Sequence, residues 1–214
     1  MNRRLLILFI LFLPAMLDAQ EADLEKPDDA FATWTDIVVR KDLGNWHVGG
    51  LVEYCTIDHG KGLTNNEFVF RPIVGYNPLT WLRFQFQVDF LYSFYSGFYM
   101  RYIPDMTFHW KVDDFRFSFR NRFQLSHHTR SGKLSYAFRN RFKTEYLIPE
   151  TPVSLHFAAE PYWFDRFIKT RYYLGADFKL NKQLTVTADY IRYQHYDVLK
   201  PHQNVVFVTL YIRL

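Results

Sequence analysis

After its first 19 residues the sequence has no run of apolar residues long enough for a transmembrane helix, which needs about 20. It also lacks the 3.6-residue hydrophobic period of amphipathic helices. Its single cysteine, Cys55, excludes an intramolecular disulfide framework. Aromatic residues make up 20% of the chain, yet mean hydropathy is −0.21, a combination that arises when apolar and polar positions alternate. Any membrane span in this chain is therefore expected to be a β-strand.

Two segments, Phe115–Leu125 and Leu134–Tyr146, alternate strictly between aromatic or apolar residues and charged or polar ones. Successive side chains of a strand point to opposite faces, so this period of two predicts strands with one apolar and one ionic face. A soluble sandwich buries such an apolar face against a second sheet. A membrane barrel turns it towards lipid and lines its lumen with the ionic face.

The N-terminal segment favours the membrane barrel. Residues 1–19 contain Arg3 and Arg4, then the apolar run Leu5–Leu17 and the small residue Ala19. A basic head, a short apolar run and a small residue at the cleavage point are typical of a secretory signal peptide. We therefore expect residues 1–19 to be removed and the mature protein to lie in the bacterial outer membrane.

The mature chain is expected to hold one domain, because its length suits a single barrel. Residues 20–31 are acidic and turn-like, and we expect a flexible periplasmic leader there, followed by an outer-membrane β-barrel over residues 32–214. The predicted fold class is all-β, a single antiparallel up-and-down transmembrane barrel. Alternation and turn residues predict strands near 33–41, 45–57, 65–76, 80–93, 98–110, 114–127, 133–147, 152–162, 168–180, 184–196 and 204–214.

The number of strands is expected to be even. Eleven strands would put the two termini on opposite sides of the membrane, whereas bacterial single-chain barrels have even numbers. We therefore expect 12 strands, one of them unrecognised, with 10 as the alternative. In the alternative, Trp34–Lys41 lies outside the wall, because this segment alternates least cleanly.

The connections and the last strand also indicate an outer-membrane barrel. Tight connections such as Asn77–Leu79 alternate with mostly longer ones such as Asp58–Thr64, as expected for periplasmic turns and external loops. The apolar stripe from Val206 to Leu214 resembles the terminal strand that the barrel-assembly machinery reads. We expect that machinery, outer-membrane lipids and lipopolysaccharide as partners. Tryptophans near strand ends predict aromatic girdles at the membrane interfaces, namely Trp46, Trp81, Trp110 and Trp163.

Two Phe-Arg-Asn-Arg-Phe strings stand about one hairpin apart and are followed by three further motifs. The five segments are Phe119–Phe123, Phe138–Phe142, Glu160–Phe164, Arg171–Ala176 and Leu184–Tyr190. In this order they resemble a family of bacterial outer-membrane proteins catalogued as domain of unknown function 2490. The resemblance covers residues 34–214, implies a barrel in the outer membrane and transfers no activity or site residues.

Inward-facing arginines on two adjacent strands form the candidate binding site. In one interpretation they pair with inward carboxylates and hold a narrow barrel closed, because buried charges must be paired. In the alternative they attract acidic solutes, and the protein is a small porin selective for anions or acidic oligosaccharides. This arginine ladder comprises Arg116, Arg120, Arg122, Arg139, Arg141 and Lys143.

A second alternative is a lipid-modifying hydrolase, which needs a serine nucleophile beside a histidine base. Ser126, His127 and His128 supply the atoms, but only Ser126 and His128 share a strand face. We expect no enzyme and assign no catalytic residue. We also expect no cofactor and no metal, because no Cys or His pair has zinc-site spacing. Nucleic-acid binding is not expected, since the arginines alternate with phenylalanine instead of forming a solvated patch.

Overall fold

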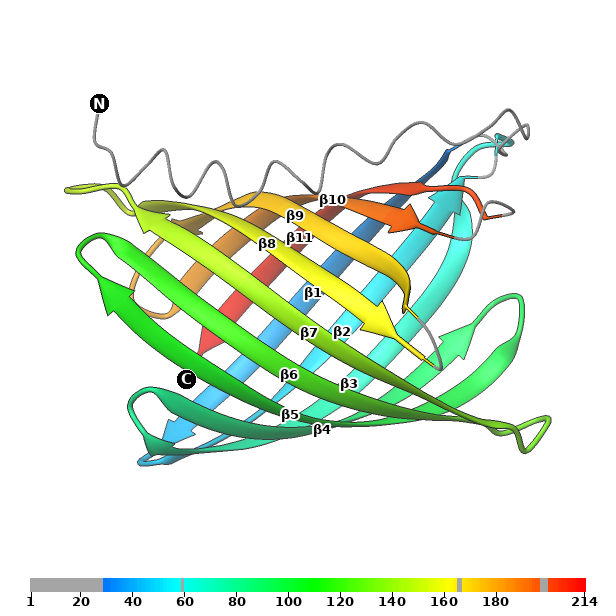
Figure 1. The fold of residues 1–214 in the computed structure, drawn as a ribbon, viewed down its shortest axis with the longest axis horizontal. Helices are drawn as coiled ribbons and strands as arrows, with labels where there is room; N and C mark the ends of the chain where they lie inside the picture. Colours follow the sequence, from blue (N-terminus) through cyan, green and yellow to red (C-terminus); the bar gives the residue numbers. More distant parts are fainter. Residues whose placement is uncertain (1–28, 59, 165–166, 197–199) are drawn as a thin grey trace.

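The computed structural model describes residues 29–58, 60–164, 167–196 and 200–214, which form eleven strands (Figure 1). The predicted signal peptide, and the predicted leader up to residue 28, lie outside the described residues. Within the described residues no helix is long and apolar enough to cross a membrane. The strands are β1 (Ala30–Leu43), β2 (Trp46–Asp58), β3 (Thr64–Leu79), β4 (Leu82–Ser93), β5 (Gly97–Val112), β6 (Phe115–His128), β7 (Leu134–Leu147), β8 (Val153–Trp163), β9 (Phe167–Lys179), β10 (Leu184–His195) and β11 (Gln203–Arg213).

The strands close into one barrel in which each strand pairs with its sequence neighbours and β1 pairs with β11. The predicted all-β barrel is confirmed. The strand number differs from the expected 12 or 10: the described residues form eleven, and Trp34–Lys41 belongs to the wall as part of β1. An odd number makes the first and last strands run in the same direction, so the sheet is mixed and not fully antiparallel. The seam is parallel, with Ala30 opposite Gln203 at one end and Arg40 opposite Arg213 at the other.

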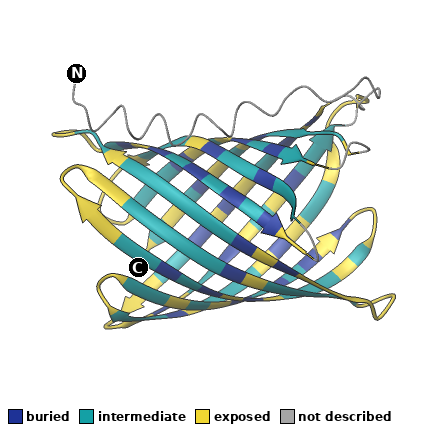
Figure 2. Ribbon diagram, viewed as in Figure 1, coloured by how far each residue is buried: buried dark blue, intermediate teal, exposed yellow. Residues whose placement is uncertain are grey.

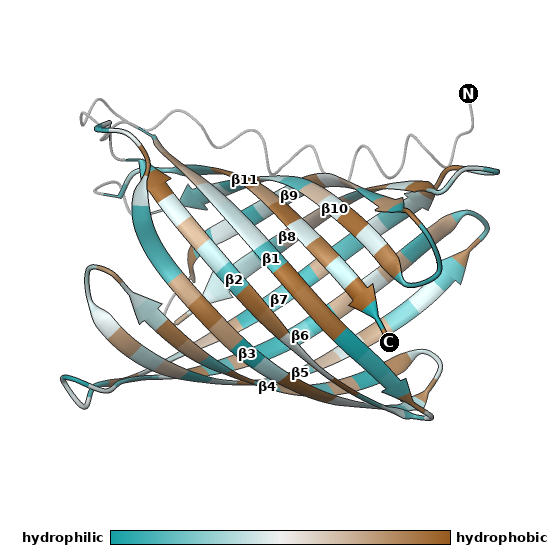
Figure 3. Ribbon diagram, turned by 180° about the vertical axis from the view of Figure 1, so that it is seen from behind, coloured by the Kyte–Doolittle hydropathy of each residue, from teal (hydrophilic) through white to brown (hydrophobic). Residues whose placement is uncertain are grey.

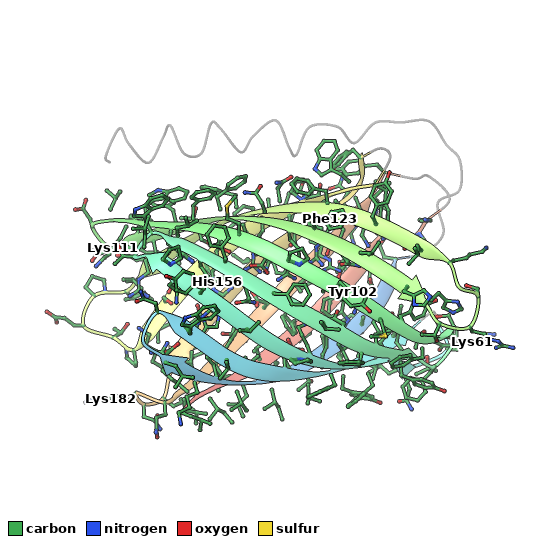
Figure 4. The ribbon with its side chains drawn as sticks, turned by 90° about the horizontal axis from the view of Figure 1, so that it is seen from below. Lys61, Tyr102, Lys111, Phe123, His156 and Lys182 are labelled. Carbon is green, nitrogen blue, oxygen red and sulfur yellow. The ribbon has the colours of Figure 1, made fainter. Side chains whose placement is uncertain are left out.

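The barrel has two different ends. The connections after β1, β3, β5, β7 and β9 gather at one end, called here the turn end, and those after the even-numbered strands gather at the loop end. Figure 4 shows Lys111 and Lys182 at the turn end and Lys61 at the loop end. At the turn end Gly44 has a φ of 64°, a left-handed conformation that glycine adopts without strain in a tight turn. The C-terminus lies at the turn end, where Leu214 N–H donates to the Arg40 carbonyl.

Burial alternates along the strands, as the period of two predicts (Figure 2). On β4, Phe84 and Phe86 are exposed on the outer face, whereas Gln87 and Asp89 are buried inside. Brown and teal bands alternate along the strands in Figure 3 for the same reason. Large apolar side chains therefore form the outer surface of the barrel, and polar side chains with a small apolar core fill its interior.

Candidate functional site

The lumen contains a cavity of about 1140 Å³ lined by residues from all eleven strands. Its lining includes Arg40, Arg83, Lys182 and Arg213 at the turn end and reaches Trp34 in the middle of the barrel. The residues that line the cavity include fourteen Lys or Arg and eight Asp or Glu. This excess of positive charge inside a low-dielectric wall raises the local concentration of anions.

Two carboxylates with no solvent exposure pair with arginines inside the lumen, Asp89 on β4 and Glu160 on β8, and Glu160 contacts the ladder. Arg120 Nη2 donates to Glu160 Oε1 at 2.6 Å, and Arg139 Nη2 donates to Oε2 at 3.0 Å. The Tyr173 hydroxyl also donates to Oε2, at 2.9 Å, and Arg171 Nη1 lies 3.8 Å from the same oxygen. Glu160 therefore holds guanidinium groups from three strands, β6, β7 and β9, in one buried cluster.

Aromatic rings enclose the Glu160 cluster on its loop-end side. The Arg171 guanidinium carbon lies 4.3 Å from the ring centroid of Tyr193, 4.6 Å from that of Tyr162 and 5.3 Å from that of Trp34. A desolvated cation over an aromatic face contributes about 2 kcal/mol. These rings adjoin a buried apolar cluster on β1 and β8–β11, so the lumen is packed along this side of the barrel wall. The cluster comprises Ala32, Ala158, Tyr173, Ile191, Tyr193 and Val205.

The predicted arginine ladder does lie on the inner faces of β6 and β7, but its members differ in how they are paired. Arg120 lies directly opposite Arg141, and Arg122 directly opposite Arg139. Like charges placed opposite each other destabilise a sheet unless counter-charges are present. Glu160 neutralises Arg120 and Arg139, and Asp105 Oδ2 accepts a hydrogen bond from Arg122 Nη2 at 2.8 Å.

The remaining ladder residues are held loosely. Arg116 Nη1 lies 3.7 Å from Glu145 Oε1, and Lys143 Nζ lies 3.6 Å from Asp177 Oδ2. The buried Nε atoms of Arg120, Arg122, Arg139 and Arg141 all lack a hydrogen-bond partner. Of these four described arginines, only Arg141 has no carboxylate within ion-pair distance. All six ladder residues line the cavity, but three of them are closely paired with buried carboxylates and the other three are paired loosely or not at all.

A family described as "Protein of unknown function (DUF2490)" matches residues 31–204. The chain belongs to this family. The resemblance inferred from the sequence motifs is thereby confirmed, and the barrel fold fits a family of outer-membrane barrels. No curated protein matches the chain. All six ladder residues and the Glu160 cluster lie within the DUF2490 match.

The DUF2490 domain also contains a cluster that the sequence analysis missed, centred on His156 of β8. Its Nε2 lies 2.6 Å from Asp189 Oδ1, and its Nδ1 lies 3.3 Å from Asp177 Oδ2. Gly175 permits this approach, because a Cβ there would lie 2.2 Å from Asp189 Oδ1 and 2.8 Å from His156 Nε2. A glycine inside a strand often marks a close approach, so Gly175 was the signal that could have revealed this cluster.

The serine and histidines considered for a hydrolase lie at the loop end of β6. His128 Nε2 is 2.7 Å from the Ser96 carbonyl oxygen, and its Nδ1 is 2.5 Å from Ser131 Oγ. Ser126 Oγ instead accepts a hydrogen bond from Gln124 Nε2 at 3.1 Å. The structure therefore does not pair Ser126 with His128. Among the described residues of the DUF2490 domain, no group of three or more His, Cys, Asp or Glu side chains is placed to hold a metal ion.

Proposed function

We propose that this DUF2490 protein is an outer-membrane β-barrel whose lumen is closed to the passage of solutes at its loop half. The observation that carries this proposal is the buried Glu160 cluster, whose ion pairs and aromatic rings project into the lumen from β1, β6, β7, β8, β9 and β10. The remaining half of the lumen is a cationic cavity that opens at the turn end. In this proposal the paired arginines are structural, and the barrel is not a porin.

The outer surface supports a membrane location. The strands have 11 to 16 residues, enough for tilted strands to cross a bilayer, which takes about 9–11. Aromatic side chains are exposed at both rims, with Trp46, Trp81 and Trp110 at the turn end and Trp163 at the loop end. Such girdles sit at membrane interfaces. Lipids and lipopolysaccharide are the partners that this apolar outer face fits.

The connections support an orientation with the turn end in the periplasm, since short turns are periplasmic in outer-membrane barrels. The outward stripe of β11, from Val206 to Ile212, then ends at the periplasmic side, where the barrel-assembly machinery acts. In this orientation β1 begins on the outer side, where Asp29 forms an ion pair with Arg192. We expected residues 29–31 to belong to a periplasmic leader, but in this orientation they lie on the outer side of the membrane.

We expect the mature chain to fractionate with the outer membrane and to migrate faster on a gel before boiling than after it. The reason is that a barrel with every strand paired on both sides has no open edge at which a detergent can begin to unfold it. The measurement is sodium dodecyl sulfate gel mobility of separated membrane fractions with and without heating. Recovery of the unheated chain in the soluble periplasmic fraction would contradict the membrane location.

We expect the purified protein to give no steady ionic current in planar bilayers, because in the proposed closed barrel no continuous water path crosses the loop half of the lumen. The alternative, an anion-selective porin, predicts a steady anion-selective current. It further predicts that this selectivity is lost in the combined variant R120Q/R122Q/R139Q/R141Q. Observing that current in the wild type and its loss of selectivity in the variant would establish the porin and reject the closed barrel.

A further inference from the structure

We propose that the loosely paired half of the ladder, formed by Arg116, Arg141 and Lys143, is a binding site for a small solute with two or more phosphate or carboxylate groups. The site lies in the turn-end cavity, so the inference rests on the proposed one-ended barrel. Its function would be to bind such a solute from the turn end, not to conduct it.

The strongest observation is that Arg141 has no carboxylate partner among the described residues. Arg141 is the cross-strand neighbour of Arg120 in the β6–β7 pair, and of these two arginines only Arg120 lies within ion-pair distance of Glu160. The Arg141 guanidinium carbon lies 5.9 Å from the ring centroid of Tyr173. A partly buried cation with an unsatisfied donor is costly unless a partner is bound. An anionic ligand would supply that partner and would also relieve the repulsion between Arg120 and Arg141.

The surroundings of Arg141 provide the space and the additional charges. Arg141 lines both the main cavity and an adjoining one of about 600 Å³, within the usual range of ligand pockets of about 300–1000 Å³. Arg116 and Lys143 line both cavities too. Their ion pairs, at 3.7 and 3.6 Å, are long compared with the 2.6 Å contact between Arg120 and Glu160. A bound anion can therefore replace these pairs without disturbing the buried cluster.

The chemistry and spacing of these groups define the ligand class. The planar guanidinium fork of arginine matches phosphate and carboxylate oxygens, and lysine adds a mobile point charge. Residues 141 and 143 share the inner face of β7, so their Cα atoms lie about 6.7 Å apart along the strand. Two cations at that spacing suit a ligand with two anionic groups better than a single oxyanion. Sugars and other neutral solutes lack the charge that this lining favours.

The test uses pyrophosphate as the probe and the full mature chain in zwitterionic detergent, with binding measured by isothermal titration calorimetry. We expect saturable binding that R141Q weakens about tenfold or more, as expected for one lost charge-assisted contact. The matched control is R130Q, which removes the same charge from an exposed loop-end residue on the connection between β6 and β7. R130Q should leave the affinity unchanged.

Several outcomes would overturn the proposal. One is that the folded wild type does not bind pyrophosphate. Another is that R141Q and R130Q weaken the affinity for pyrophosphate equally, which would indicate a general charge effect. Heat-modifiable gel mobility checks the fold of each variant, and K143Q provides a second variant should R141Q fail to assemble.

A phosphate group could also come from a lipid headgroup, so the titration is repeated in nanodiscs. Unchanged affinity when phosphatidylglycerol replaces phosphatidylcholine supports a free solute. Competition by phosphatidylglycerol would overturn that assignment in favour of a lipid. If the bilayer recording shows no ionic current and pyrophosphate does not bind, this binding site is rejected while the proposed closed barrel is retained.

Discussion

Replacing Glu160 with glutamine should lower the free energy of unfolding by about 3–5 kcal/mol, the cost of removing one partner from a buried ion pair. The substitution removes the charge that holds Arg120 and Arg139 at 2.6 and 3.0 Å, in a side chain with no solvent exposure. The guanidinium groups left behind would repel one another in a low-dielectric interior. The measurement is urea unfolding of the barrel in lipid vesicles, followed by tryptophan fluorescence.

The matched control is Glu145→Gln, which removes the same charge from a looser pair. The Glu145 carboxylate is 3.7 Å from the Arg116 guanidinium, whose side chain is 45% exposed. An ion pair with one exposed partner is screened by water and contributes about 0–1 kcal/mol, as surface pairs do, and a glutamine can still accept the hydrogen bond from Ser154 Oγ. This variant should therefore destabilise the barrel far less than E160Q. Equal destabilisation by E160Q and E145Q would mean that the Glu160 cluster does not organise the lumen.

Replacing Phe86 with arginine should destabilise the barrel by about 2–4 kcal/mol in a bilayer, the cost of a lipid-facing charge near the midplane. Phe86 lies on the outer face of β4 and is 44% exposed. The control, Val112→Arg, also places the charge on the outer face but at the turn-end rim of β5. There the cost falls to about 0–1 kcal/mol. The measurement is the free energy of unfolding in vesicles.

The comparison of these two variants distinguishes a membrane barrel from a water-soluble one. In water both positions are already exposed, so both variants would unfold at nearly the wild-type urea concentration. A similar small effect at Phe86 and Val112 would therefore reject the lipid-facing assignment. A depth-dependent difference would support it.

The outward and inward sets of residues could be predicted from the sequence because a strand places them by its period of two. The expected strand at Leu134–Tyr146, for example, is β7 (Leu134–Leu147), with the ladder residues on its inner face. The strand number was expected to be even only by analogy with other barrels. No local pattern reports how the last strand closes the sheet, so the parallel β1–β11 seam could not be predicted.

Local sequence determined the strands, their two faces and the presence of arginines in the lumen. The tertiary structure decided which of those arginines are paired, because Glu160 comes from β8 and Asp105 from β5, and only closure of the barrel brings them to β6 and β7. It also decided that Trp34, Tyr162 and Tyr193 lie inside, where strand alternation alone gave no reason to expect aromatic rings around Arg171. Ion pairs and ring contacts across a lumen depend on barrel diameter and strand stagger, which are properties of the whole sheet and not of any one strand.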